Sequence, residues 1–356
     1  MNWIRGFCLI ILAGFLIASC TSAPIYKGET SNHFIDGQFR NSTPMNKGII
    51  ELSRLGWGML TESERWPDWL SIQQSRIQEH RVAEGPVVTF INHATFLIQV
   101  NGLNILTDPI WSKRASPFSW AGPKRVHAPA VELTDLPPID VILISHNHYD
   151  HLDSDTLQTI ARRDSGPPLI LAGLGNAAYF DRLGLPNAID LDWEQSHTVA
   201  NVEFVFSETR HRSGRGLTDQ MKTLWGAFVI KAPQSTLYFA GDTGYDAHFK
   251  ATGDKHGPVN LALLPIGAYE PRWFMKDVHV NPREAVQAHL DLRAEKSIGM
   301  HFGTFQLTYE QRDQPISDLA DALREAGLSE HQFLVPAPGQ RFDWPFSART
   351  VPATQK

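Results

Sequence analysis

Residues 141–151 read Val-Ile-Leu-Ile-Ser-His-Asn-His-Tyr-Asp-His. The first four are apolar and typical of a buried strand, and the rest form a His-x-His-x-Asp-His turn. Two histidines separated by one residue project to the same side of an extended backbone, and the Asp-His pair that follows reaches a second point nearby. One turn can therefore serve two metal ions.

The ligand types indicate which metal such a turn would take. Imidazole and carboxylate suit Zn²⁺, with iron and manganese as alternatives. The chain has two cysteines, Cys8 and Cys20, both near its N-terminus, so the body has no thiolate for a copper or structural zinc site. We expect two Zn²⁺ ions, or iron or manganese in their place.

The turn alone offers too few ligands for two ions, and three more candidates each follow an apolar run typical of a strand. They are His211, Asp242 and His301. Gly241 and Gly244 flank the aspartate, and their backbone freedom lets the chain pass close to a metal pair. The aspartate is then placed to bridge the two ions.

Short apolar runs recur along the chain with turn signals and helical stretches between them. The runs that predict strands are 87–91, 96–100, 141–144, 169–172, 202–206, 227–230, 237–240 and 261–264. Helices are predicted at 155–163 and 281–290, the second with Asn281 as N-cap and Glu284 at the third helical position. This mixture indicates an α/β protein, and no linker composition divides its body.

Composition excludes several classes of protein. The 356 residues are 42% hydrophobic and 20% charged, as in a folded globular chain. With 32 Lys and Arg against 38 Asp and Glu, the formal net charge is −6. We therefore expect no nucleic-acid partner, since that binding relies on positive charge.

The N-terminus has the pattern of a targeting signal. An apolar run after Arg5 is too short for a normal membrane span and is typical of a signal peptide, predicted at 1–19. The residues before Cys20 resemble a bacterial lipobox, which implies acylation of that cysteine; an ordinary secreted protein is the alternative. Thr21 resembles the pattern of lipoproteins sorted to the outer membrane, so we expect a lipid-anchored protein of the bacterial cell envelope, facing the periplasm. Residues 20–45, rich in small polar residues, are predicted to be a tether, and 46–356 the catalytic domain.

Several stretches together resemble a known family, the N-acyl-phosphatidylethanolamine-hydrolysing phospholipases D of the metallo-β-lactamase superfamily. The stretches are His-Ala-Thr-Phe-Leu-Ile at 93–98, Leu-Thr-Asp-Pro-Ile at 106–110, Gly-Pro-Lys-Arg at 122–125, 145–153, Gly-Asp-Thr-Gly-Tyr at 241–245, 265–275 and His-Phe-Gly-Thr-Phe at 301–305. The likeness runs from about His33 to the C-terminal region. It implies an αββα sandwich of two mixed β-sheets flanked by helices.

The resemblance also implies roles for particular residues. It places His146, His148 and His211 on one zinc, Asp150, His151 and His301 on the other, and Asp242 between them. His279 would face the substrate phosphate, and the helix that starts just after it would offer free N–H groups to the same anion. The catalytic residues would be Asp242 and His279, whereas Asp108 and Asp153 would orient ligands or, for Asp153, cap the next helix.

The implied activity is a phospholipase D reaction at a membrane surface. Attack of a metal-activated hydroxide on phosphorus would convert N-acyl-phosphatidylethanolamine or a related phospholipid to phosphatidic acid and the head-group alcohol. Aromatic stretches at 57–69 and 269–275 would line an acyl groove or belong to the core.

Two departures from the family pattern leave the substrate open. Residues 212–214 read Arg-Ser-Gly where the animal members carry a different, aromatic-containing loop, and the leader is absent from those members. The alternatives are a hydrolase of the same fold acting on a lactone, thioester or soluble phosphodiester, and a non-catalytic metal-binding envelope lipoprotein.

Overall fold

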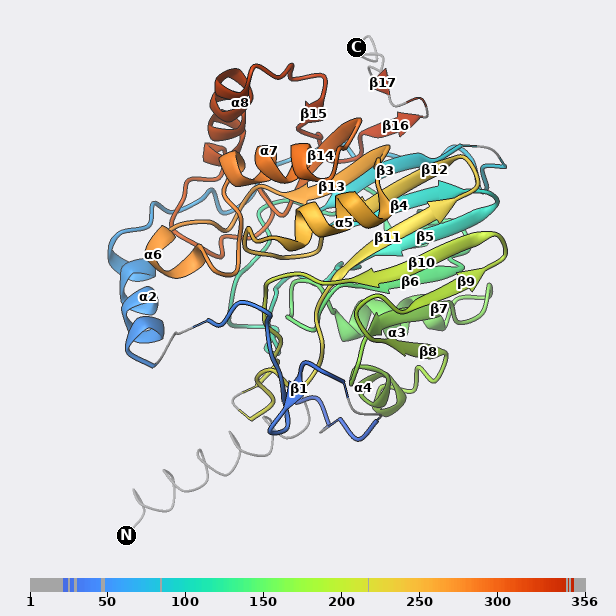
Figure 1. Ribbon diagram of the computed structural model, residues 1–356, viewed down its shortest axis with the longest axis horizontal. Helices are drawn as coiled ribbons and strands as arrows, with labels where there is room; N and C mark the ends of the chain where they lie inside the picture. Colours follow the sequence, from blue (N-terminus) through green and yellow to red (C-terminus); the bar gives the residue numbers. More distant parts are fainter. Residues whose placement is uncertain are drawn as a thin grey trace.

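Two β-sheets pack face to face, with helices on both outer surfaces (Figure 1). The computed structural model describes residues 22–24, 26–28, 31–45, 49–83, 85–216, 218–343, 345 and 347–348. The predicted signal peptide and Cys20 lie outside these residues. The layers match the αββα sandwich that the sequence predicts.

One sheet has seven strands and carries most of the second half of the chain. Its order is β15-β14-β13-β12-β11-β10-β9, antiparallel from β9 to β12 and parallel from β12 to β15. The strands are β9 (Ser196–Val199), β10 (Val202–Ser207), β11 (Ala227–Ala232), β12 (Ser235–Phe239), β13 (Leu261–Pro265), β14 (Lys296–Met300) and β15 (Phe333–Leu334).

The other sheet has eight strands in the order β17-β16-β3-β4-β5-β6-β7-β8, antiparallel up to β5 and parallel from β5 to β8. The strands are β3 (Val87–Asn92), β4 (Thr95–Val100), β5 (Leu103–Thr107), β6 (Val141–Ile144), β7 (Leu169–Gly173), β8 (Ala188–Leu191), β16 (Arg341–Asp343) and β17 (Ser347–Ala348). Both sheets are thus mixed, as predicted.

The apolar run of β6 is buried on both of its faces. Val141 and Leu143 belong to the core between the sheets, whereas Ile142 and Ile144 belong to the core under the outer helices. Successive side chains of a strand point to opposite faces, so a strand covered on both sides needs apolar residues throughout. This explains why the decisive stretch is continuously apolar instead of alternating.

Helices cover each sheet on its outer side (Figure 1). Leu157 of α3 and Phe180 of α4 pack on the eight-stranded sheet, and α5, α7 and α8 contribute to the core of the other. The helices are α2 (Ile49–Thr61), η1 (Leu133–Asp135), α3 (Ser154–Ala161), α4 (Ala177–Arg182), α5 (His248–His256), α6 (Arg272–Met275), α7 (Pro282–Asp291) and α8 (Gln314–Ala326). In the described part of the chain, no helix combines the length and apolarity that a membrane crossing requires.

The described residues of the predicted tether lie against the body. Residues 34–39 form a small hairpin, β1 (Phe34–Ile35) and β2 (Gln38–Phe39), in which Phe39 is fully buried. Its amide donates to Met221 O at 2.7 Å, and His33 stacks on Trp193. The aromatic residues within this polar segment supply the apolar surface that packs on the body.

Candidate metal centre

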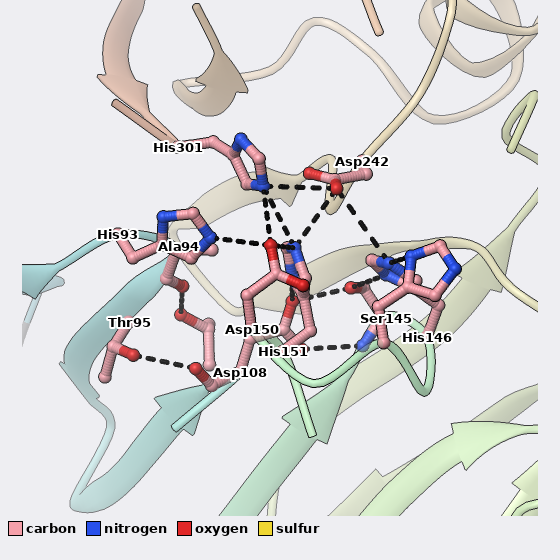
Figure 2. A network of polar contacts seen from close by, with 12 residues as sticks. His93, Ala94, Thr95, Asp108, Ser145, His146, Asp150, His151, Asp242 and His301 are labelled. Carbon is pink, nitrogen blue, oxygen red and sulfur yellow. Dashed lines mark hydrogen bonds and ion pairs between the residues drawn. The ribbon is translucent and has the colours of Figure 1, made fainter. Parts of the chain in front are cut away.

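The predicted ligands gather at one edge of the sandwich, where strands of both sheets end (Figure 2). The His-x-His-x-Asp-His turn follows β6 of the eight-stranded sheet. The other three candidates follow β10, β12 and β14 of the seven-stranded sheet: His211, Asp242 and His301. Two sheets stacked face to face therefore bring distant segments to one point.

Asp242 lies at the centre of the cluster. Its Oδ2 atom is 3.1 Å from His151 Nε2 and 3.2 Å from His301 Nε2. The same oxygen is 3.9 Å from His146 Nε2 and 3.8 Å from His211 Nε2. This is the place expected of a carboxylate that bridges two ions.

Around Asp242 the ligands fall into two groups. The imidazole half consists of His146, His148 and His211. His148 Nδ1 lies 2.8 Å from His146 Nε2 and 3.3 Å from His211 Nε2. The carboxylate half consists of Asp150, His151 and His301. Asp150 Oδ2 lies 3.4 Å from His151 Nε2 and 3.2 Å from His301 Nε2. These two Nε2 atoms are 3.2 Å apart. The structure thus brings together all seven predicted ligands in the two groups expected.

The protonation states of the imidazole half suit metal ions. Burial and neighbouring histidines hold the pKa of His146 and His148 well below the ordinary value. Burial likewise lowers the pKa of His211 to about 4, although Asp242 opposes it. Neutral imidazole is the form that binds a metal.

The carboxylate half has the opposite balance. Burial opposes ionisation of Asp150 and Asp242, but the surrounding histidines outweigh it and hold each pKa well below its usual range. Burial lowers the pKa of His301, yet Asp242 and Asp150 raise it to about 9. Two buried carboxylates thus demand positive charge, which protons supply in the metal-free protein and divalent ions can supply instead.

Orphaned polar atoms point the same way. Asp242 Oδ1 and the Nδ1 atoms of His279 and His301 are buried without a hydrogen-bond partner. Nitrogens of neighbouring imidazoles also face each other across the cluster, where one proton can serve only one such pair. Because buried polar atoms are normally satisfied, this donor set fits bound cations.

His279 lies beside the cluster, as predicted. Its Nε2 atom is 3.9 Å from Asp242 Oδ2, and its ring packs against that of His301 at 5.3 Å between centroids. It lines a cavity of about 270 Å³ that opens over the cluster. A substrate in this cavity would contact it.

The carboxylate half is supported by residues behind it. Asp108 accepts hydrogen bonds from His151 Nδ1 at 2.6 Å and from Ser145 N at 2.8 Å, which fixes the imidazole with Nε2 toward the cluster. His93 places Nε2 3.0 Å from Asp150 Oδ2, and burial lowers its pKa to about 3. The sequence alone did not assign His93 to the site. Its position was a signal all the same, because His93 and Asp108 each directly follow a strand, as the ligands do.

The imidazole half is supported by the N-terminal segment. Asn41 Nδ2 donates to His211 O at 2.8 Å, and Asn41 Oδ1 accepts from His211 N at 3.0 Å. The ring of His211 donates from Nδ1 to Val278 O at 2.9 Å, which leaves Nε2 for the cluster. Nothing in the sequence around Asn41 indicated this contact across 170 positions.

Of the two roles considered for Asp153, the structure shows the helix cap. It caps α3 by accepting from Thr156 N, and its carboxylate also accepts from Ser112 N at 2.9 Å. This ties the end of the metal-binding turn to the segment after Asp108.

The aromatic stretches divide between the surface, the core and the cavity lining, and Tyr269 and Phe274 are buried. Met275 and Val278 line the cavity, whereas Trp57, Trp69 and Trp273 are 68%, 52% and 42% exposed. The cavity rim is therefore partly apolar, as an acyl chain requires, but the tryptophans lie outside it.

Comparisons with known proteins agree with this geometry. Residues 103–302 match the model of the beta-lactamase superfamily domain. The N-acyl-phosphatidylethanolamine-hydrolyzing phospholipase D 1 of Caenorhabditis elegans is 38% identical over 286 residues, which cover 74% of this chain and 79% of that protein. A mitochondrial N-acyl-phosphatidylethanolamine-hydrolyzing phospholipase D of Saccharomyces cerevisiae is 34% identical over 74% of this chain and 57% of its own length.

Among solved structures, the metallo hydrolase Igni18 of the archaeon Ignicoccus hospitalis superposes with a TM-score of 0.54. It is 21% identical and covers 74% of this chain and 99% of its own, a likeness of fold. The segment that matches the family model contains all seven candidate ligands. On these grounds the chain belongs to the metallo-β-lactamase superfamily, as a hydrolase of that fold and a homologue of N-acyl-phosphatidylethanolamine-hydrolysing phospholipases D.

Proposed function

We propose that the protein is a dizinc phosphodiesterase of phospholipase D type. It would hydrolyse N-acyl-phosphatidylethanolamine or a related phospholipid to phosphatidic acid and the head-group alcohol. The observation that carries this proposal is the cluster that contains all seven candidate ligands around Asp242, in a chain 38% identical to a phospholipase of that name. Iron or manganese would serve the same ligands.

The chemistry divides between the metals and the protein. When bound, paired divalent ions lower the pKa of a water and neutralise charge on the phosphoryl oxygens. His279 orients the phosphate from the cavity wall, because its ring lies beside Asp242 and lines the cavity. Asp242, at the centre of the cluster, would help to return a proton to the leaving alcohol.

The direct test is release of phosphatidic acid by protein loaded with zinc. Vesicles that contain N-acyl-phosphatidylethanolamine should yield it, with plain phosphatidylethanolamine as the comparison. Water-soluble esters, lactones and phosphodiesters form the second arm. Turnover of these alone, with no phosphatidic acid from either vesicle, would assign the protein to another hydrolase activity of the fold; metal binding without turnover anywhere would make it a non-catalytic metal protein.

A variant separates the role of His279 from that of the metal ligands. His279→Ala should raise KM while both metals stay bound, since its ring is placed to face substrate. Metal content is measured by elemental analysis beside the kinetics. Loss of one metal in this variant would show that His279 is a ligand.

The lipid anchor and the envelope location are part of the proposal. A single acyl chain binds a bilayer reversibly, whereas several together anchor stably, so an acylated Cys20 would hold the enzyme where its substrate is concentrated. Labelling cells with a radioactive fatty acid should mark the wild-type protein and leave Cys20→Ser unlabelled. An unlabelled wild-type protein found in the culture medium would indicate ordinary secretion.

A further inference from the structure

Arg212 directly follows the ligand His211 and lines the cavity over the cluster. His148, His211 and Asp242 of the cluster line the same cavity as Arg212. On its other side the guanidinium lies 5.9 Å from the ring centroid of Phe274. The residue is half-buried between the cluster and this apolar wall.

Among the described residues, no carboxylate forms an ion pair with Arg212, and its guanidinium has no hydrogen-bond partner. Two positions earlier, Arg210 is ion-paired, with Asp277 at 3.1 Å and Asp246 at 3.6 Å. A guanidinium stays protonated in a protein, so an unpaired one in a partly buried site is costly unless an anion arrives.

The backbone holds Arg212 in place from both sides. Before it, the main chain of His211 is bound by the side chain of Asn41 through two hydrogen bonds. After it, Gly214 N donates to Asn147 Oδ1 at 2.7 Å, and that asparagine lies between the first two histidines of the metal-binding turn. The main chain that carries Arg212 is therefore held between the two metal-ligand segments, which keeps its side chain within reach of the cavity.

The helix amides that we expected to bind the anion are largely occupied. Asn281 caps α7 by accepting from Glu284 N at 2.9 Å, and Glu284 Oε2 accepts from Asn281 N at 3.1 Å. Pro282 has no amide hydrogen. Among the protein's own groups, recognition of a negative charge in this cavity thus falls to side chains, and Arg212 is the arginine in its lining.

We infer that Arg212 is a substrate-binding residue that pairs with the non-bridging oxygens of the phosphodiester, opposite His279 in the same cavity. This rests on the proposed function and deepens it, since it makes an anionic phosphate the recognised feature of the substrate. A guanidinium matches two phosphate oxygens with two parallel N–H groups, and such charge-assisted bonds are strong.

The experiment measures binding of inorganic phosphate to the zinc-loaded protein by calorimetry, together with KM and kcat on N-acyl-phosphatidylethanolamine vesicles. Arg212→Gln should weaken phosphate binding about 10- to 100-fold, the equivalent of losing charged hydrogen bonds. KM should rise by a similar factor with a smaller change in kcat. Arg212→Lys should recover part of the lost phosphate affinity, because lysine keeps the positive charge but lacks the two parallel N–H groups of the guanidinium.

Arg210→Gln is the matched control. It removes a guanidinium two residues away that is already paired with carboxylates, so phosphate affinity should stay at the wild-type value. KM for neutral water-soluble esters should be unchanged in both variants.

A measurement on the wild-type protein guards against a variant that fails to fold. Arginines modified by phenylglyoxal are mapped by mass spectrometry with and without inorganic phosphate. Phosphate should protect Arg212 and leave modification of the exposed Arg54 unchanged.

The inference is overturned if Arg212→Gln binds phosphate as tightly as the wild type, or if phosphate leaves Arg212 unprotected. It is supported without the phospholipase activity if phosphate binding depends on Arg212 while vesicles release no phosphatidic acid. Phosphate binding that depends on Arg212, without release of phosphatidic acid, would reject the lipid substrate of the proposed function and keep the role of Arg212.

Discussion

The two halves of the cluster share Asp242 but rely on different supports. In the imidazole half, neutral histidines are held by uncharged groups: Asn41 binds the main chain of His211, and Val278 O accepts from its ring. In the carboxylate half, Asp150 supplies charge, and a second buried carboxylate, Asp108, backs His151. One half thus depends on the placement of neutral groups and the other on charge.

This difference gives the halves unequal expected affinities. A divalent ion gains more from a site with a carboxylate among its own ligands than from neutral imidazoles alone. We therefore expect a chelator to remove the metal of the imidazole half first. The following predictions test whether the halves are separable, from the largest effect to the smallest.

Asp242→Asn should break both halves at once. The change removes the negative charge that lies within 4 Å of histidines from each half, so kcat/KM should fall on the order of 10³-fold or more and metal content should drop. Activity on vesicles and elemental analysis check this. Asp254→Asn, an exposed carboxylate paired with Lys250, is the control and should behave like wild type. Retention of both metals with activity intact would remove Asp242 from the centre of the site.

Asp108→Asn should weaken the carboxylate half selectively. The amide cannot accept from His151, Ser145 N and Ser145 Oγ together, so His151 loses its fixed orientation. Loss of such a supporting contact typically costs about 10- to 100-fold in metal affinity. Competition with a chelator measures the affinity of each of the two metal sites separately. Equal weakening of both metals would mean that the halves are not independent.

The matched control for that variant is Asp190→Asn. Asp190 is also partly buried, and it accepts from Gly175 N and Ala177 N at the start of α4, away from the cluster. The Asp190→Asn variant should unfold at a lower temperature than the wild type, with no change in metal affinity. A metal loss here would attribute the Asp108 effect to general destabilisation.

Asn41→Ala should weaken the imidazole half by about tenfold, the lower end of the range for a supporting contact. Both main-chain polar groups of His211 lose their partner, so the ring is less firmly placed. The cobalt-substituted protein reports this through its absorption spectrum, beside chelator competition. Gln38→Ala, which removes a contact from the same hairpin to Gln220 O, is the control. An unchanged imidazole half would show that the N-terminal segment packs on the site without supporting it.

The smallest expected effect concerns stability and pH in the metal-free protein. The folded pKa of His301, about 9, lies above that of an ordinary imidazole, about 6.5. Its proton therefore contributes stability that is complete below about pH 6.5 and is lost as pH rises toward about 9, at most about 1.4 kcal/mol for each unit of pH. Thermal unfolding of the metal-free protein at pH 6.5 and 9.0 should show this loss. The metal-loaded protein should not lose stability in this pH range. If stability fell equally with pH in the metal-free and metal-loaded proteins, the charge balance assigned to the carboxylate half would be contradicted.

Much of this site was predictable from local sequence. The spacing of His146, His148, Asp150 and His151 sets their relative positions within one turn, because neighbouring side chains in a short segment have few arrangements. The capping box at Asn281 and Glu284 is equally local, and the structure has it as predicted. The remote ligands His211, Asp242 and His301 followed from a simple rule, since polar residues after buried strands meet at the sheet edge.

Only the tertiary structure decided which groups support these ligands and which charge is left unpaired. Apolar periodicity records which face of an element is buried, but it does not say which polar groups meet across the chain. The contact of Asn41 with His211 spans 170 positions, and it places part of the predicted tether against the body. Arg212 and Arg210 look alike in sequence, and their surroundings alone pair one with carboxylates and leave the other facing the cavity. Long-range polar contacts depend on how sheets and loops pack together, so they become visible only when the whole chain is folded.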